Sequence, residues 1–136
     1  MKEFMLGVNY WASHAGTDMW REWDEEIVEK DLKLLADNGL TVLRVFPNWR
    51  DFQPVKPAFG GGHRLREYRM VNDGYPDNPY YLDEEMLDRF GRFCRIAEKN
   101  GLKLIVGLIT GWMSGRLFVP AALYEKNIYT DPTALF

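Results

Sequence analysis

Three short apolar runs, each ending at or shortly before a tryptophan, constrain this chain more than any other feature. The runs cover residues 4–10, 41–46 and 103–109, and the tryptophans that follow are Trp11, Trp49 and Trp112. Two amphipathic helical patterns separate the runs, so the order is strand, helix, strand, helix, strand. Continuous hydrophobicity is typical of parallel strands whose two faces are both covered by helices. The sequence therefore predicts an α/β fold in which the strand ends share one edge and bind ligands there.

Both predicted helices carry matching start and stop signals. Asp24 and Asp83 are suited to cap the first turns, and two glutamates follow each of them near the positive end of the helix dipole. Gly39 and Gly101, each within Asn-Gly-Leu, suit the left-handed residue that ends a helix. The repeat of these signals indicates a tandem β/α unit with a long loop in its second copy.

Residues 47–82 are predicted to form that loop, because prolines and glycines interrupt any regular pattern. They include Pro54, Pro57 and the run at 60–62, which we interpret as a flexible hinge. The loop leaves the second strand at its C-terminal end, which is the predicted ligand side.

A third helix is predicted to begin at Asp131 and Pro132, one turn before Phe136. Three parallel strands leave open edges, and a closed (β/α)₈ barrel needs about 250 residues. We therefore expect residues 1–136 to be the N-terminal portion of a single barrel domain, about three β/α units, cut at the start of the third helix. The alternative is a half-barrel that self-associates, or assembles with other chains, through its open sheet edges.

Composition excludes several classes of protein. The 17 basic and 20 acidic residues are interspersed and give a net charge of -3, which argues against a nucleic-acid partner. No apolar run is long enough for a membrane span, and no signal peptide is visible, so we expect a cytoplasmic protein, or a secreted one if a leader was removed. Cys94 is a single cysteine on an apolar helix stripe, and His14 and His63 have no ligand-spaced partner. We expect no metal and no cofactor.

Arg44 is the sharpest single candidate for a functional residue. It interrupts an apolar strand near its C-terminal end, where a buried charge is costly unless it is paired. In a closed barrel it could reach a carboxylate on another strand; the alternative is a structural ion pair or an edge-strand charge. Asn9 and Tyr10 end the first strand in the same way, either to bind a ligand hydroxyl or catalytic carboxylate or to fill the barrel top.

The three tryptophans offer faces on which the C–H groups of a sugar can stack, although each alone could simply pack. Residues 110–116 contain two glycines and end in Arg116, which could bind an anion or pair within the loop. No acid directly follows any strand, and Asp51 is the nearest. Glycoside hydrolysis needs two carboxylates, so the catalytic acids are predicted to lie outside this segment.

Three segments carry a family resemblance, namely residues 6–11, 43–54 and 107–115. At these residues the chain resembles the first third of a clan A glycoside hydrolase, the (β/α)₈ superfamily that includes the cellulase and β-mannanase-like glycoside hydrolase family 5. The resemblance implies a retaining hydrolase of β-linked glycosides such as glucan or mannan, in which Arg44 supports the nucleophile. Similar sequences often have a histidine where this chain has Trp112.

The resemblance also implies that the acid/base and nucleophile glutamates follow strands four and seven, beyond Phe136. We therefore expect this chain alone to be inactive and to supply part of a face that binds an oligo- or polysaccharide. The residues expected on that face are Asn9, Tyr10, Trp11, Trp49, Trp112 and Arg116. The alternative function is a non-catalytic carbohydrate-binding or scaffold protein.

Overall fold

The computed structural model describes residues 4–59, 66–70, 82–108, 110–113, 116–119 and 130. Its contacts divide the chain into two compact units. The first unit comprises Met1–Pro47 and Glu84–Leu108, and the second comprises Asn48–Asp83 and Ile109–Phe136. The expectation of one domain over residues 1–136 stays a prediction.

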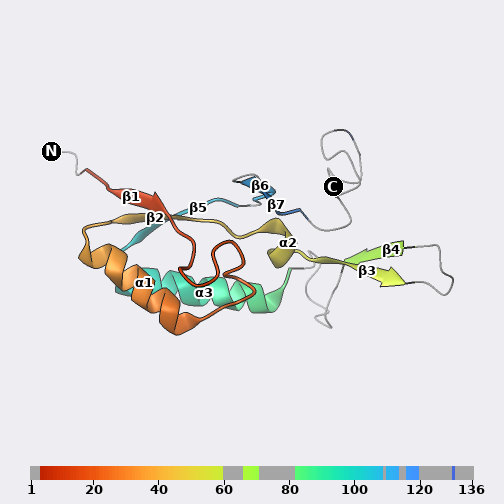
Figure 1. The fold of residues 1–136 in the computed structure, drawn as a ribbon, viewed down its shortest axis with the longest axis horizontal. Helices are drawn as coiled ribbons and strands as arrows, with labels where there is room; N and C mark the ends of the chain where they lie inside the picture. The colour runs from red at the N-terminus through yellow and green to blue at the C-terminus, as the bar shows by residue number, and fades with distance from the viewer. Residues whose placement is uncertain are drawn as a thin grey trace. The chain divides into compact units, whose positions relative to one another are not determined.

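A three-stranded parallel sheet forms the centre of the first unit (Figure 1). Its strands, in spatial order, are β1 (Gly7–Asn9), β2 (Val42–Val45) and β5 (Lys103–Val106). In this register Asn9 pairs with Arg44, and Arg44 pairs with Ile105. The predicted parallel arrangement is confirmed, and each strand is shorter than the apolar run that predicts it.

Two helices lie along one face of this sheet (Figure 1). They are α1 (Glu25–Asp37) and α3 (Glu84–Lys99). The Asp24 carboxylate accepts a hydrogen bond of 3.1 Å from the backbone N–H of Ile27, so the predicted N-cap of α1 is confirmed. Gly39 and Gly101 have φ angles of +84° and +68°, which is the left-handed conformation predicted for the residue after each helix.

The core of the first unit lies between the sheet and these helices. Its fully buried side chains include Val28, Leu32, Leu43, Val45 and Phe93. On the opposite face, the exposed residues are Gly7 and Asn9 of β1, Arg44 of β2, and Lys103 and Ile105 of β5. The expectation that helices cover both faces of the strands is therefore wrong for the described residues, because α1 and α3 lie on the same face.

The segment 47–82 holds more regular structure than predicted. It contains α2 (Trp49–Phe52), β3 (Val55–Phe59) and β4 (Arg66–Met70), and β3 pairs antiparallel with β4. Pro57 lies within β3 opposite Tyr68. A two-stranded sheet has only edge strands, where a proline is tolerated, so the proline signal did not exclude a strand here.

A second short hairpin follows, in which β6 (Trp112–Met113) pairs antiparallel with β7 (Arg116–Leu117). The glycine run at 60–62 and the predicted third helix at Asp131 lie outside the described residues. Within the part of the chain that the structure describes, no helix is long and apolar enough to cross a membrane.

Candidate functional site

Asn9 and Arg44 come together at the carboxyl ends of β1 and β2. They are register partners, so both side chains stand on the same face of the sheet. That face holds a depression of about 490 Å³, lined by Asn9, Arg44, Met5, Gly7, Val8, Val42 and Ile105. Arg44 is exposed. The depression therefore combines an amide and an accessible guanidinium with an apolar floor.

Phe46, which follows β2, joins Arg44 to Trp11. The Phe46 side chain is buried, and the guanidinium carbon of Arg44 lies 4.7 Å from its ring centroid. The half-buried Trp11 stacks on the same ring with 5.3 Å between centroids and 21° between planes. These are favourable cation–π and aromatic geometries. The first unit thus brings Asn9, Trp11 and Arg44 to one strand edge.

Tyr10 points away from that depression, toward the helices. It is buried, its ring centroid lies 5.5 Å from that of Phe93, and its hydroxyl donates to Oδ2 of Asp31 at 3.1 Å. Burial raises the pKa of Tyr10 well above its usual value, and the nearby Asp31 carboxylate adds to the rise. Tyr10 therefore fastens the end of β1 to α1, and its hydroxyl is occupied.

Asp31 also fixes the chain just after Trp11. Its carboxylate accepts from the backbone N–H and the hydroxyl of Ser13, both at 2.8 Å. A smaller depression of about 230 Å³ adjoins this contact and includes Trp11 in its lining. Sequence reasoning missed Asp31, although an acid between Val28 and Leu35 on the apolar face of α1 is a signal that could have identified it.

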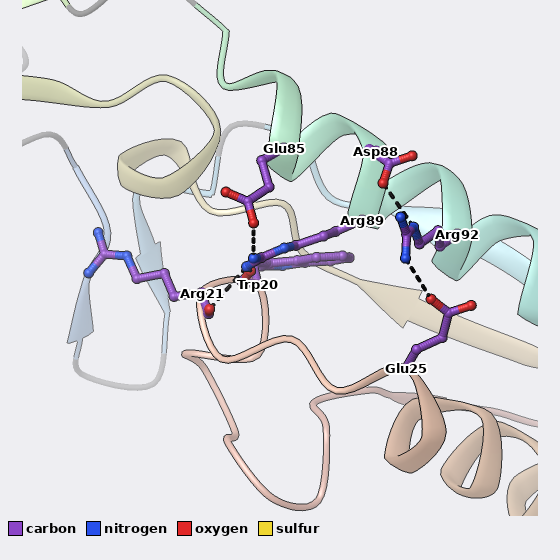
Figure 2. Close-up of polar contacts among 7 residues, drawn as sticks. All are labelled: Trp20, Arg21, Glu25, Glu85, Asp88, Arg89 and Arg92. Carbon is purple, nitrogen blue, oxygen red and sulfur yellow. Dashed lines mark hydrogen bonds and ion pairs between the residues drawn. The ribbon is translucent and has the colours of Figure 1, made fainter. Parts of the chain in front are cut away.

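The segment between β1 and α1 is anchored through Trp20 (Figure 2). Trp20 is fully buried, and its Nε1–H donates to the Phe46 carbonyl oxygen at 2.8 Å. From α3, the Arg89 guanidinium donates to the carbonyl oxygens of Trp20 and Arg21 and pairs with Glu85. Sequence reasoning missed Trp20, because it lies outside the helices and strands and no hydrophobic periodicity links it to Phe46.

The second unit contains the other predicted aromatic residues. Trp49 begins α2, is half-buried, and donates from Nε1 to the Gln53 side-chain oxygen at 2.9 Å. Trp112 in β6 is 66% exposed. The backbone of Arg116 pairs with Met113, whereas its side chain lies outside the described part. The expectation that the three tryptophans share one rim remains a prediction, because Trp11 belongs to the first unit and Trp49 and Trp112 belong to the second.

Asp51 is buried within the second unit. Its carboxylate accepts from Nε of Arg50 at 3.0 Å and from Nδ2 of Asn48 at 3.2 Å. The Arg50 guanidinium lies 5.2 Å from the ring centroid of Phe118, and the Arg50 backbone N–H donates to the Phe118 carbonyl oxygen at 2.8 Å. These contacts give Asp51, the acid nearest to a strand end, a structural role.

Metal ligands do not cluster among the residues that are described: no group of three or more His, Cys, Asp or Glu side chains could hold an ion. Cys94 is half-buried on α3, where burial raises the pKa of its thiol and disfavours the reactive thiolate. The chemistry that this part of the chain offers is therefore hydrogen bonding, positive charge and aromatic stacking.

Several solved structures of glycoside hydrolases are similar to this arrangement. An exo-β-1,4-mannosidase from Opitutaceae bacterium strain TAV5 matches 98% of this chain with a TM-score of 0.73 and 30% identity. A GH5_18 protein from Bifidobacterium longum subsp. longum, in complex with Manβ1-4GlcNAc, matches 98% with a TM-score of 0.71 and 25% identity. A GH5_18 protein from Streptomyces cattleya, in complex with GlcNAc, matches 96% with a TM-score of 0.70 and 25% identity.

The chain spans only 20%, 27% and 27% of the lengths of these three proteins. No protein-family model matches it, and no curated protein matches it significantly. The structural matches nevertheless confirm the resemblance to glycoside hydrolase family 5 and the predicted fold class. The parallel sheet and its two helices are part of a (β/α)₈ barrel.

Proposed function

We propose, from the match to glycoside hydrolase family 5, that this chain supplies part of the sugar-binding edge of a retaining glycosidase that acts on β-linked glycosides. The observation that carries the proposal is the pairing of Asn9 with Arg44 at adjoining strand ends, on the open face of the sheet. An amide and a guanidinium can both donate hydrogen bonds to sugar hydroxyls or to a carboxylate. Trp11 adds an indole beside them for stacking against sugar C–H groups.

Retaining hydrolysis places two carboxyl groups about 5–5.5 Å apart, one as nucleophile and the other as acid and base. Among the described residues that line the depression around Asn9 and Arg44, none is acidic. In our proposal both carboxylates come from other β/α units of the barrel, and Arg44 binds the nucleophile and stabilises its charge. The chain alone then binds sugar but does not hydrolyse it.

β-1,4-Mannosides are the substrate class that we propose. The matched proteins include an exo-β-1,4-mannosidase and a GH5_18 protein in complex with Manβ1-4GlcNAc. These names support mannosides over glucans within the broader class of β-linked glycosides. Trp49, Trp112 and Arg116 of the second unit are proposed to contribute to the same substrate-binding face.

A non-catalytic carbohydrate-binding protein is the second candidate, and the lack of an acid in the described lining favours it. Both candidates keep sugar binding at Asn9, Trp11 and Arg44, and they differ in whether the complete barrel carries the two carboxylates. Reading the gene downstream of Phe136 separates them. Glutamates after strands four and seven support the hydrolase, and their replacement by other residues supports the binding protein.

Titration of this chain with Manβ1-4GlcNAc, followed by NMR, tests the binding part of the proposal. We expect weak binding, with a dissociation constant of about 1 mM, and a loss of about tenfold in Arg44→Met because a charged hydrogen bond is removed. Arg95→Met is the matched control, since Arg95 is also exposed in the first unit but lies on α3. Equal binding by all three proteins would contradict the proposal, and turnover of an aryl β-mannoside by the chain alone would contradict its inactivity.

A further inference from the structure

The Phe46 ring contacts both the arginine and the tryptophan of the proposed sugar-binding edge. It is 2% exposed, so it cannot itself be a binding surface. Arg44 lies over its ring at 4.7 Å, and Trp11 stacks on it at 5.3 Å. Long side chains such as arginine lose considerable rotamer entropy when they bind a ligand in one geometry. A ring that already restrains Arg44 lowers that cost, because part of the ordering is complete before a ligand arrives.

The backbone of Phe46 is itself held in place from outside the sheet. Its carbonyl oxygen accepts the indole N–H of Trp20 at 2.8 Å, and Trp20 is fully buried. The ring of Trp20 packs against Phe90 and Phe93 of α3, with 5.8 Å between centroids in each pair. Arg89 of α3 binds the Trp20 carbonyl oxygen (Figure 2). A continuous set of contacts therefore runs from α3 through Trp20 to Phe46.

We propose that Phe46 is a positioning residue that holds Arg44 and Trp11 in their ligand-binding geometry, and that Trp20 positions Phe46 by binding its carbonyl oxygen. The physical coupling depends only on contacts within the first unit. Its consequence for sugar binding rests on the proposed function.

Phe46→Leu tests the coupling, because leucine keeps an apolar side chain but removes the aromatic face. In NMR spectra of the labelled chain, we expect the Arg44 side-chain signals to lose their ring-current shift and the Trp11 indole signal to move. The matched control is Phe118→Leu in the second unit, where an equally buried ring lies under Arg50. That control is expected to move the Arg50 signals and leave those of Arg44 and Trp11 unchanged. Unchanged Arg44 and Trp11 signals in Phe46→Leu would overturn the proposal.

A second pair of variants tests the role of Trp20 with a smaller change in packing. Trp20→Phe keeps an aromatic ring and removes the donor to the Phe46 carbonyl oxygen. Trp23→Phe is its matched control, since Trp23 stacks on Trp20 at 6.0 Å and its buried Nε1 has no hydrogen-bond partner among the described residues. We expect the Phe46 carbonyl, Arg44 and Trp11 signals to move in Trp20→Phe only. Equal effects of the two variants would overturn the role of Trp20.

Should Phe46→Leu fail to fold, nuclear Overhauser contacts in the wild-type chain still decide the matter. Contacts from the Phe46 ring to both the Arg44 and Trp11 side chains support the proposal, and their absence refutes it. In folded Phe46→Leu, the dissociation constant for Manβ1-4GlcNAc is expected to rise about three- to tenfold through loss of the cation–π contact and of ordering. If the wild-type chain binds no sugar while the NMR coupling is observed, the proposed function fails and the positioning role stands.

Discussion

One arginine in each unit lies over a phenylalanine ring, and the two differ in their other partner. Arg50 is near Phe118 and also pairs with Asp51, whose side chain is fully buried while that of Arg50 is 21% exposed. Arg44 lies over Phe46 and is exposed, and within the described part of the chain no carboxylate pairs with it.

The same cation–ring contact has a different role in each unit. In the second unit the charge of Arg50 is compensated internally, so the contact belongs to the packing of α2 against the segment that contains Phe118. In the first unit the ring restrains Arg44 without neutralising it. The positive charge of Arg44 therefore stays available to a ligand.

The largest expected difference comes from replacing each arginine with methionine, which keeps the long apolar stem. Arg50→Met leaves the Asp51 carboxylate buried without its cation and is expected to cost about 3 kcal/mol. Arg44→Met is expected to change the free energy of unfolding by less than about 0.5 kcal/mol, as at an exposed site. Urea denaturation, with amide exchange at residues 48–53 as a local probe, measures the change in the free energy of unfolding for each variant. Equal losses in the two variants would contradict the different roles of Arg50 and Arg44.

One glycine in each unit, Gly7 in the first and Gly111 in the second, is expected to lose a different amount of stability when it is replaced by alanine. A Cβ at Gly7 would lie 2.7 Å from the carbonyl oxygen of Val42, so Gly7→Ala must push β1 away from β2, at a cost of about 2 kcal/mol. A Cβ at Gly111 would lie 3.4 Å from Cγ1 of Val119, which is ordinary contact, and Gly111→Ala is expected to cost under about 1 kcal/mol. Thermal unfolding compares the stabilities of the two variants. A larger loss in Gly111→Ala than in Gly7→Ala would refute the tight approach of β1 to β2.

Alkaline pH should weaken the first unit through Tyr10 while both arginines keep their charge. The pKa of Tyr10 is raised in the folded state by burial and by Asp31, so the folded chain holds a proton that an unfolded tyrosine releases near pH 10. The stabilisation is complete below pH 10 and falls by about 1.4 kcal/mol per pH unit above it. Tyr10→Phe should flatten this slope between pH 10 and 12 in urea titrations; an unchanged slope would argue against a buried, protonated hydroxyl.

The smallest effect is expected at Arg92, which bridges Asp88 and Glu25 on the surface between α3 and α1 (Figure 2). All three side chains are about half exposed, so solvent and salt screen the pairs. Arg92→Met should lower the unfolding temperature slightly at low salt and leave it unchanged at high salt. A decrease in unfolding temperature as large as that of Arg50→Met would show that solvent exposure does not explain the difference between Arg92 and Arg50.

Much of the first unit was predictable because its signals are local. Asp24 and Gly39 mark the two ends of α1 by their own chemistry, and the apolar runs fix the parallel strands. The register partners Asn9 and Arg44 were both identified, since a polar residue at the end of a buried strand needs a hydrogen-bonding partner, a ligand or solvent. The alternation of side chains along a strand also implies that Tyr10 faces the side opposite to Asn9, toward the helices.

The missed features depend on contacts between distant segments. The bond from Trp20 to the Phe46 carbonyl oxygen joins an irregular segment to a strand end, and no periodicity connects the two. In the sequence, Asp51 is an acid close to a strand end and therefore a candidate for the functional site. Its burial beside Arg50 follows only from the structure. The hairpin of β3 and β4 was not predicted, because its segment is rich in prolines and glycines. Their preference for turns does not indicate that the flanking residues pair as strands.

The attachment of Trp20 to Arg89 has a consequence for how the chain acquires its fold during synthesis. The two residues are 69 positions apart, so the ribosome completes α1 and β2 well before Arg89 emerges. At about 5–20 residues per second, Trp20 waits several seconds for its partner. The segment that connects β1 to α1 therefore lacks its contacts with Arg89 until α3 emerges, and nascent chains halted before α3 should leave that segment more open to proteases.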